Sequence, residues 1–251
     1  MQRQTEKKNV FKFFYQSTLF QKYENQVARY ADRCFTPHYT LRNKLKRVNR
    51  NVDMLFHAHN YAILPALQSS HNNQIHVGFA GFIHYRLLDK WLLAALKQED
   101  IILHLIGPLQ NYDLTPFNKF SNFKYTSPLK EEQLIEKLLE MDVLIIPLNT
   151  DLPEVEVITT NSKTFQYIAA RKPIVISNFP HYIDMPKGVI YRAATADDFV
   201  VKIRKAYTED CKKYVNMRAQ IAQENTWDKR GDQLLGVMRK DVPSIKSFKI
   251  S

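Results

Sequence analysis

The sequence predicts an α/β fold, a Rossmann-like parallel sheet flanked by helices. From Ile75 onward, short apolar runs alternate with stretches whose apolar residues recur at helical spacing. The apolar runs are continuous, as at Val143–Ile146, which is typical of strands covered on both faces in a parallel sheet. The chain has 251 residues, of which 45% are hydrophobic, so it can bury a sizeable core.

The expected elements follow in a regular order. Strands are expected at Ile75–Ala80, Ile101–Ile106, Phe123–Tyr125, Asp142–Pro147, Pro173–Ser177 and Val189–Tyr191. Helices are expected at Leu87–Lys97, Lys130–Glu140, Ser162–Ala170, Thr195–Tyr207 and Trp227–Arg239. Ser127 followed by Pro128 has the pattern of an N-cap with proline at the first helical position, and it predicts a helix start there.

The chain before about residue 70 has a different texture. It is basic and mostly helical in pattern, with Tyr23, Val27 and Tyr30 at helical spacing and a second short helix expected at Tyr39–Arg47. We therefore expect three parts. These are a basic, mostly helical segment at 1–70, a Rossmann-like domain at 71–226, and a C-terminal helix and tail at 227–251.

Positive charge is concentrated in the first 50 residues. They hold twelve Lys or Arg against three acidic residues, a net charge of +9, whereas the whole chain carries +11. Aromatic residues such as Phe11, Phe14, Phe20 and Tyr23 are interleaved with these charges. The segment could therefore dock on a partner domain, or contact an anionic membrane surface, where each cation is worth about 1 kcal/mol. Nucleic acid is the least favoured partner.

Several classes of protein are disfavoured. Two cysteines without a CxxC spacing indicate neither a disulfide framework nor a zinc site, and eight histidines without HExxH indicate no metal site. The sequence lacks GxGxxG, GxxxxGK[ST] and GxSxG motifs, which disfavours NAD enzymes, P-loop NTPases and Ser-His-Asp hydrolases. No apolar run reaches 18 residues and no signal-peptide pattern opens the chain, so we expect a cytoplasmic protein.

Two positions after the first predicted strand are candidates for ligand contact. Glycine is scarce, with six in the chain, so Gly81 marks a backbone constraint. It lies where the carboxyl edge of a parallel sheet approaches its ligands. Arg86 follows five residues later. It is placed either to reach a phosphate over that edge or to lie on a helix surface.

The helix expected at Ser162–Ala170 carries a cation in an unusual position. Asn161 is its N-cap and Lys163 lies in its first turn, where a cation opposes the helix dipole by roughly 0.3–1 kcal/mol. A diphosphate bound at the helix N-terminus would resolve this conflict. The alternative is an exposed lysine that reaches into solvent.

From Tyr23 to the C-terminal helix, the chain resembles retaining glycosyltransferases of the two-domain GT-B architecture. The family includes sucrose synthases and lipopolysaccharide mannosyltransferases. Its phrase K-[LT]-F-E-Y-[LI]-A-x-G-K-P-V-V stands at Lys163–Val175 as KTFQYIAARKPIV. Tyr30–Pro37 is similar to the family's A-D-x-V-x-x-x-S, Leu55–Tyr61 to its L-P-H-G-V-D-Y hinge, and Asn225–Arg230 to its S-W-x-x-R.

The resemblance implies the second, donor-binding half of such an enzyme, with residues 1–70 as the end of an acceptor domain plus hinge. Arg86 and Lys163 would neutralise a diphosphate, the Gly81 loop would let it approach, and Gln166 would face the ribose or nucleoside. The implied donor contacts are Gly81, Arg86, Thr160, Asn161, Lys163 and Gln166. The resemblance implies no metal.

The chain also departs from the family pattern. The family's two glutamates fall on Ile158 and Gln166, so both carboxylates are missing unless Glu154 or Glu156 supplies one. A glutamine can hydrogen-bond a hydroxyl, but it cannot stabilise an oxocarbenium-like transition state by negative charge. One family glycine falls on Arg171. Nucleotide-sugar binding is therefore better supported than catalysis, and no catalytic residue is assigned.

We therefore expect a domain that binds a UDP- or GDP-sugar for transfer to a glycan or lipid-linked acceptor, as in polysaccharide biosynthesis. Roughly 150 or more residues of acceptor domain would be expected before Tyr23, so the resemblance implies a missing or separate acceptor-domain chain. The alternatives are a degenerate, non-catalytic interaction subunit and a basic protein held at the inner face of a membrane.

Overall fold

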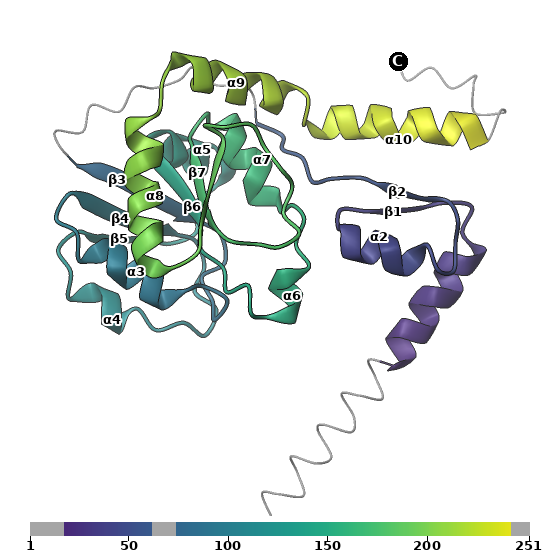
Figure 1. Ribbon diagram of the computed structural model, residues 1–251, viewed down its shortest axis with the longest axis horizontal. Helices are drawn as coiled ribbons and strands as arrows, with labels where there is room; N and C mark the ends of the chain where they lie inside the picture. The colour runs from purple at the N-terminus through teal and green to yellow at the C-terminus, as the bar shows by residue number, and fades with distance from the viewer. Residues whose placement is uncertain (1–17, 62–73, 242–251) are drawn as a thin grey trace, which may run out of the picture. The chain divides into compact units, whose positions relative to one another are not determined.

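The computed structural model describes residues 18–61 and 74–241. The chain divides into two compact units, Met1–Phe56 and His57–Ser251, which are described separately (Figure 1).

The first unit is small. It contains a helix over residues 18–30, strand β1 (Cys34–Thr36), helix α2 (Tyr39–Leu45) and strand β2 (Val52–Met54). The two strands pair in parallel, with Cys34 opposite Val52. Sequence patterns predicted the helices but not these strands, because three residues are too few to show a period. The core consists of Ala28, Leu45 and Val52, with Cys34, Leu41 and Val48 packed against it.

The second unit is built on a six-stranded parallel sheet of order β5-β4-β3-β6-β7-β8. All six strands predicted from the apolar runs are present, which confirms the α/β class and the parallel sheet. The strands are β3 (Ile75–Ala80), β4 (Ile101–Ile106), β5 (Phe123–Thr126), β6 (Val143–Ile146), β7 (Ile174–Ser177) and β8 (Ile190–Ala193). β4, β6 and β7 are buried along their whole length, as continuous apolar runs require.

The five predicted helices of this unit are present. They are α3 (Asp89–Leu96), α5 (Glu131–Leu139), α7 (Ser162–Ala169), α8 (Ala196–Thr208) and α10 (Trp227–Asp241). The N-cap predicted at Ser127 is wrong, because α5 starts after Lys130, whose backbone N–H donates to the side chain of Gln133. Three helices were not predicted: α4 (Thr115–Asn118), α6 (Pro153–Glu156) and α9 (Lys212–Gln223).

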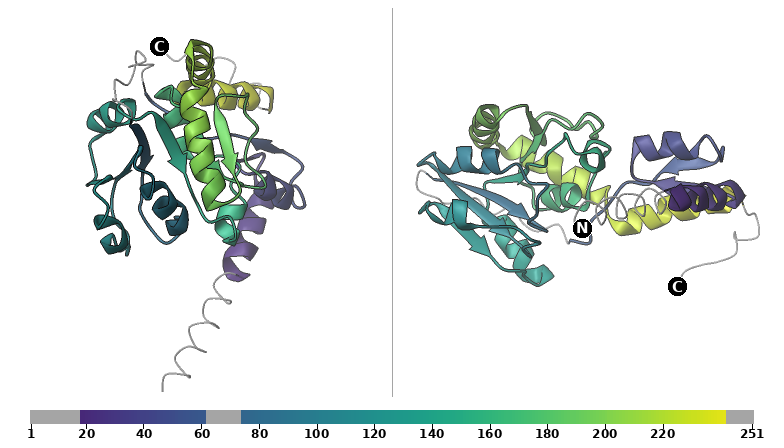
Figure 2. Two further views of the ribbon diagram at one scale, coloured as in Figure 1. Left: turned by 60° about the vertical axis from the view of Figure 1, so that its left-hand side comes forward. Right: turned by 90° about the horizontal axis from the view of Figure 1, so that it is seen from below.

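Helices cover both faces of the sheet. From β3 the chain crosses to β4 in one direction, and from β6 it crosses to β7 in the other, so right-handed crossovers place α3 and α7 on opposite faces. α8 packs beside α3, with the rings of Trp91 and Phe199 5.3 Å apart (Figures 1 and 2). Because α7 lies between the parallel strands β6 and β7 in the chain, its N-terminus lies at the carboxyl edge of the sheet.

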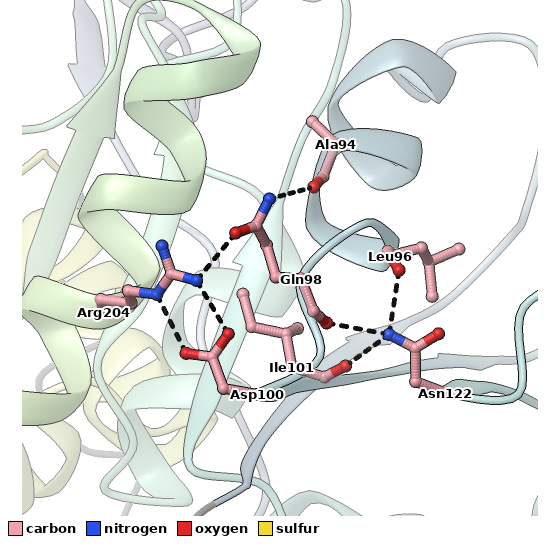
Figure 3. Close-up of polar contacts among 7 residues, drawn as sticks. All are labelled: Ala94, Leu96, Gln98, Asp100, Ile101, Asn122 and Arg204. Atoms are coloured by element: carbon pink, nitrogen blue, oxygen red, sulfur yellow. Dashed lines mark hydrogen bonds and ion pairs between the residues drawn. The ribbon is translucent and has the colours of Figure 1, made fainter.

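Structural hydrogen bonds close the amino edge of the sheet near β4 and β5. The side-chain amide of Asn122 donates to the carbonyl oxygens of Leu96, Gln98 and Ile101 at 2.9–3.1 Å. Arg204 of α8 donates to both carboxylate oxygens of Asp100 at 2.8 and 2.9 Å (Figure 3). These bonds fix the turn between α3 and β4.

A fully buried arginine closes the same edge near β7 and β8. The Arg218 guanidinium of α9 donates to the carbonyl oxygens of Arg171 and Gly188 at 2.7 and 2.5 Å, and to the Asp210 carboxylate at 2.6 Å. Because this arginine has three partners, its burial is compensated.

Candidate functional site

The order of the strands identifies one crevice. β3 and β6 are neighbours in the sheet, and the chain leaves them toward opposite sides. In open α/β sheets, ligands bind outside the carboxyl ends of the strands at such a switch point. The loops that follow β3 and β6 therefore form the candidate site.

Backbone hydrogen bonds join these two loops. Asn149 N–H donates to the carbonyl oxygen of Arg86 at 2.7 Å, and Leu88 N–H donates to that of Pro147 at 2.9 Å. Leu87 and Leu148 form an antiparallel bridge between the same segments. The predicted positions after β3 are thus held against the segment that leads to α7.

Gly81 is a glycine for two reasons. Its φ is +140°, a conformation that favours glycine. A Cβ at this position would lie 2.3 Å from Cε and 2.7 Å from Nζ of Lys163. The backbone after β3 therefore approaches the Lys163 ammonium more closely than any side chain would permit.

The N-terminus of α7 is fixed by its cap. Asn161 is the N-cap, as predicted, and its side-chain oxygen accepts from the backbone N–H of Thr164 at 3.0 Å. The Thr164 hydroxyl lies 2.6 Å from that of Tyr182, which is buried. Thr160, just before the cap, is buried and lies 3.1 Å from Nδ1 of His57.

Lys163 is a half-buried cation whose charge is partly desolvated. Burial lowers the pKa of its ammonium group, whose Nζ lies 5.5 Å from the ring centre of Phe79. Among the described residues, no acidic side chain forms an ion pair with it. Burying an unneutralised cation is unfavourable, and a bound anion would remove the cost. Lys163, selected from its place in the first helical turn, is therefore a candidate to bind an anion.

Tyr167 holds α7 against the end of β3. Its buried hydroxyl accepts from the backbone N–H of Ala80 at 2.8 Å and donates to the carbonyl oxygen of the same residue at 3.3 Å. Tyr167 lies one turn after Lys163, so α7 contacts β3 and Gly81 through the same face. Sequence reasoning did not select Tyr167, although it stands in the matched phrase.

Arg86 already has an anionic partner. Its Nε lies 3.4 Å from a carboxylate oxygen of Glu154 and donates to the Tyr85 hydroxyl at 3.3 Å. That hydroxyl donates to Glu154 at 2.8 Å, and the guanidinium lies 5.6 Å from the Tyr85 ring centre. The pair is half-exposed, with 39% and 41% of its two side chains accessible.

The positive charges of Arg86 and Lys163 both act on the His84 imidazole. Its pKa is lowered, first by burial and then by the positive charges of Arg86 and Lys163. Its Nδ1 accepts from the backbone N–H of Arg86 at 3.1 Å. A neutral imidazole is therefore favoured between the two cations.

The predicted residues divide into two groups. Gly81 and Lys163 approach each other directly, Thr160 and Asn161 precede Lys163 in the chain, and Arg86 acts together with Lys163 on the pKa of His84. Gln166 lies half-exposed on α7, one turn after Lys163, and its own role is not fixed by a contact. Glu154 and Tyr85 join the site through contacts that sequence spacing does not show.

Between residues 18–61 and 74–241, no group of three or more His, Cys, Asp or Glu side chains is arranged to hold a metal ion. In the same ranges, no helix combines the length and the apolar character needed to cross a membrane.

Known proteins share this fold. No family model matches the chain. It is 27% identical over 160 residues to the Bacillus subtilis protein described as "Putative teichuronic acid biosynthesis glycosyltransferase TuaH", a match that covers 61% of this chain and 40% of that protein.

Solved structures match over a larger share of the chain. Sucrose-phosphate synthase from Thermosynechococcus elongatus matches with a TM-score of 0.66 at 14% identity, over 88% of this chain and 61% of that one. Anabaena HepE in complex with UDP also matches with a TM-score of 0.66, at 12% identity, over 86% of this chain and 66% of that one. The chain therefore has a fold of the GT-B glycosyltransferases and spans less than two thirds of the first relatives' length.

Proposed function

We propose that the second unit binds a nucleotide-sugar, such as a UDP- or GDP-sugar, as the donor for glycosyl transfer to a glycan or lipid-linked acceptor. The observation that carries this proposal is Lys163, a partly desolvated cation without an acidic partner among the described residues, lying against Gly81 at the switch point of the sheet. HepE, which has the same fold, has been solved with UDP and with UDP-glucose.

In this proposal, different site residues contact different parts of the nucleotide-sugar. Lys163 and Arg86 neutralise the diphosphate, and the absence of a side chain at Gly81 lets it approach. Thr160 and Asn161 position the start of α7, while Gln166 faces the ribose or nucleoside. Charge-assisted hydrogen bonds to the phosphates would supply most of the specificity for a diphosphate.

Transfer requires more than this unit supplies. The two carboxylates of the resembled family fall on Ile158 and Gln166, and neither side chain carries negative charge. The chain also spans 40% of the length of TuaH. We propose that sugar transfer needs an acceptor domain in addition to this unit. Donor binding without transfer, even with such a domain present, would favour the non-catalytic interaction subunit.

Calorimetric titration of the whole chain with UDP, GDP, UDP-glucose and GDP-mannose tests donor binding. At least one is expected to bind, and Lys163→Met should weaken it by about tenfold or more, because a hydrogen bond to a charged group is lost. Lys137→Met, at a half-buried position of α5 where the lysine pairs with Glu140, is the matched control. Absence of binding to all four ligands, or equal affinity in Lys163→Met, would reject the proposal.

A second candidate function concerns the first unit. Phe20, Tyr23, Val27 and Tyr30 are each more than half exposed and recur at helical spacing in the helix over residues 18–30. Lys22 and Arg29 are exposed on the same helix. An apolar stripe beside cationic residues favours contact with an anionic membrane surface.

Vesicle sedimentation tests the second candidate. The chain should bind vesicles that contain phosphatidylglycerol better than pure phosphatidylcholine vesicles, and raising the salt from about 0.05 M to about 0.2 M should weaken binding by screening. Phe20→Ser with Val27→Ser should reduce binding, whereas Gln21→Ser should not. If the double variant binds as tightly as the unmodified chain, the stripe is not the membrane contact.

A further inference from the structure

The two cations of the candidate site differ in their partners. Lys163 has no acidic partner among the described residues, whereas Arg86 is engaged by Glu154 and Tyr85. A diphosphate that contacts both cations can therefore bind Lys163 directly, but it must displace Glu154 from Arg86.

The position of Glu154 is set by its helix. α6 begins with a proline at its first position, and the buried Val155 anchors it to the core. Leu152, the N-cap, donates its N–H to the carbonyl oxygen of Asn149, whose own N–H is bonded to Arg86. The backbone thus brings Glu154 and Arg86 together, and Tyr85 orients the carboxylate by a 2.8 Å hydrogen bond.

The ion pair can nevertheless be broken at small cost. Both side chains are about two-fifths exposed, and half-exposed pairs of this kind contribute little to stability. A phosphate carries more charge than a carboxylate and offers more acceptor oxygens, so it can replace Glu154 at the guanidinium.

We propose that Glu154 competes with the diphosphate of the donor for the Arg86 guanidinium. In the ligand-free protein it holds Arg86, and it must release Arg86 when a diphosphate binds. The carboxylate then weakens the binding of a nucleoside diphosphate and hastens its dissociation, which would favour product release. This inference rests on the proposed donor site and names the residue that regulates its affinity.

The competition should discriminate between ligands. A nucleoside diphosphate reaches both Lys163 and Arg86, so its binding includes the displacement of Glu154. A nucleoside monophosphate can be held by Lys163 with the Arg86–Glu154 pair intact. Glu154 therefore lowers the preference for UDP over UMP, and removing its charge should raise that preference.

Calorimetry with UDP and UMP, together with stopped-flow measurement of UDP dissociation, tests this on the full chain. Glu154→Gln should tighten UDP binding by about two- to fivefold, the range expected for a half-exposed ion pair, and slow its dissociation, with UMP affinity unchanged. Asp151→Asn removes the same charge from the exposed turn just before α6 without a contact to Arg86, and it should leave both affinities unchanged. In an Arg86→Met background, Glu154→Gln should have no effect.

The outcomes separate this inference from the proposed function. If the unmodified chain does not bind UDP or another tested donor, donor binding itself fails. If binding is present and sensitive to Lys163→Met, but Glu154→Gln leaves UDP affinity equal or weaker, only the competition is overturned. Equal tightening by Asp151→Asn would show a general charge effect and would also overturn it. Far-ultraviolet circular dichroism of each variant verifies that it is folded.

Discussion

Two lysines close together in the chain lie at opposite edges of the sheet and have opposite electrostatic surroundings. Lys163 is in the first turn of α7 at the carboxyl edge, and Lys172 precedes β7 at the amino edge. Burial lowers the pKa of both ammonium groups. At Lys172 the charges of Asp142 and Asp210 raise the pKa and oppose this effect, whereas burial alone shifts the pKa of Lys163.

The comparison distinguishes a structural cation from a binding cation. At the amino edge, Lys172 and Arg218 are buried together with carboxylates and carbonyl oxygens that satisfy them. At the carboxyl edge, Lys163 has no acidic ion-pair partner among the described residues. A ligand of opposite charge would remove the cost of burying this cation, so the electrostatic asymmetry between the edges supports the proposed anion site at the carboxyl edge.

The largest expected effect is at the amino edge. Arg218→Ala leaves the partly buried Asp210 carboxylate and two carbonyl oxygens without the guanidinium, and it should reduce the free energy of unfolding by about 3–5 kcal/mol. Arg204→Ala, which breaks the half-exposed pair with Asp100, should cost about 1 kcal/mol or less. Urea denaturation measures both. Equal costs would contradict the structural role given to the buried arginine.

Tyr167→Phe tests how the carboxyl edge is held. It removes both hydrogen bonds to Ala80 and should destabilise the protein by about 1–3 kcal/mol. Because it also loosens Gly81 relative to Lys163, nucleotide affinity should fall although Tyr167 does not touch the ligand. Tyr191→Phe, which removes a hydrogen bond to Glu209 outside the candidate site, is the control. Unchanged nucleotide affinity in Tyr167→Phe would mean that the two halves of the site are positioned independently.

Replacing each lysine by methionine should change the stability of the protein in opposite directions. Lys163→Met removes a partly desolvated charge and should stabilise the ligand-free protein by about 1 kcal/mol, while reducing its stabilisation by nucleotide. Lys172→Met should destabilise it, because Asp142 and Asp210 lose a cation. Thermal unfolding with and without UDP measures both. A destabilised Lys163→Met variant would make Lys163 a structural lysine as well.

The same lysine predicts a pH dependence. A folded-state pKa below the unfolded value means that the unfolded chain binds more protons between the two values. The free energy of unfolding should therefore rise with pH through this alkaline window, up to the usual lysine pKa. Lys163→Met should lack this rise, and a saturating nucleotide should diminish it. Urea titrations at several pH values test the sign.

The smallest expected effect lies between the two lysines. Arg171 ends α7 with a φ of +60°, where the resembled family has glycine, and its Nε is buried without a hydrogen-bond partner. Arg171→Gly should stabilise the protein by about 0.5–1 kcal/mol, because relief of the left-handed strain is partly offset by the entropy of glycine in the unfolded chain. Asn111→Gly, at a φ of +50°, should gain less because asparagine tolerates this conformation.

The strands and the α7 N-terminus could be predicted because their signals are local. Continuous apolar runs specify buried strands, and Asn161 followed by Thr164 specifies a cap. α9 was missed because its buried face carries Arg218 and Ala222 instead of an apolar stripe. β1 was missed because it has three residues.

The contacts within the site depend on residues distant in the chain. Lys163 was selected from its local conflict with the helix dipole, but its approach to Gly81 requires the strand order. The pairing of Arg86 with Glu154 similarly follows from the meeting of two loops. Sequence spacing contains neither relation.

The small core of the first unit has a consequence for the time scale of its motions. With Ala28, Leu45 and Val52 as its buried apolar residues, opening the β1–β2 pair exposes little surface. Its amide protons should therefore exchange with deuterium much sooner than those of β6 and β7, which are buried throughout. A partner that covered the exposed apolar stripe would slow that exchange. The exchange rates would therefore detect the partner without a label on it.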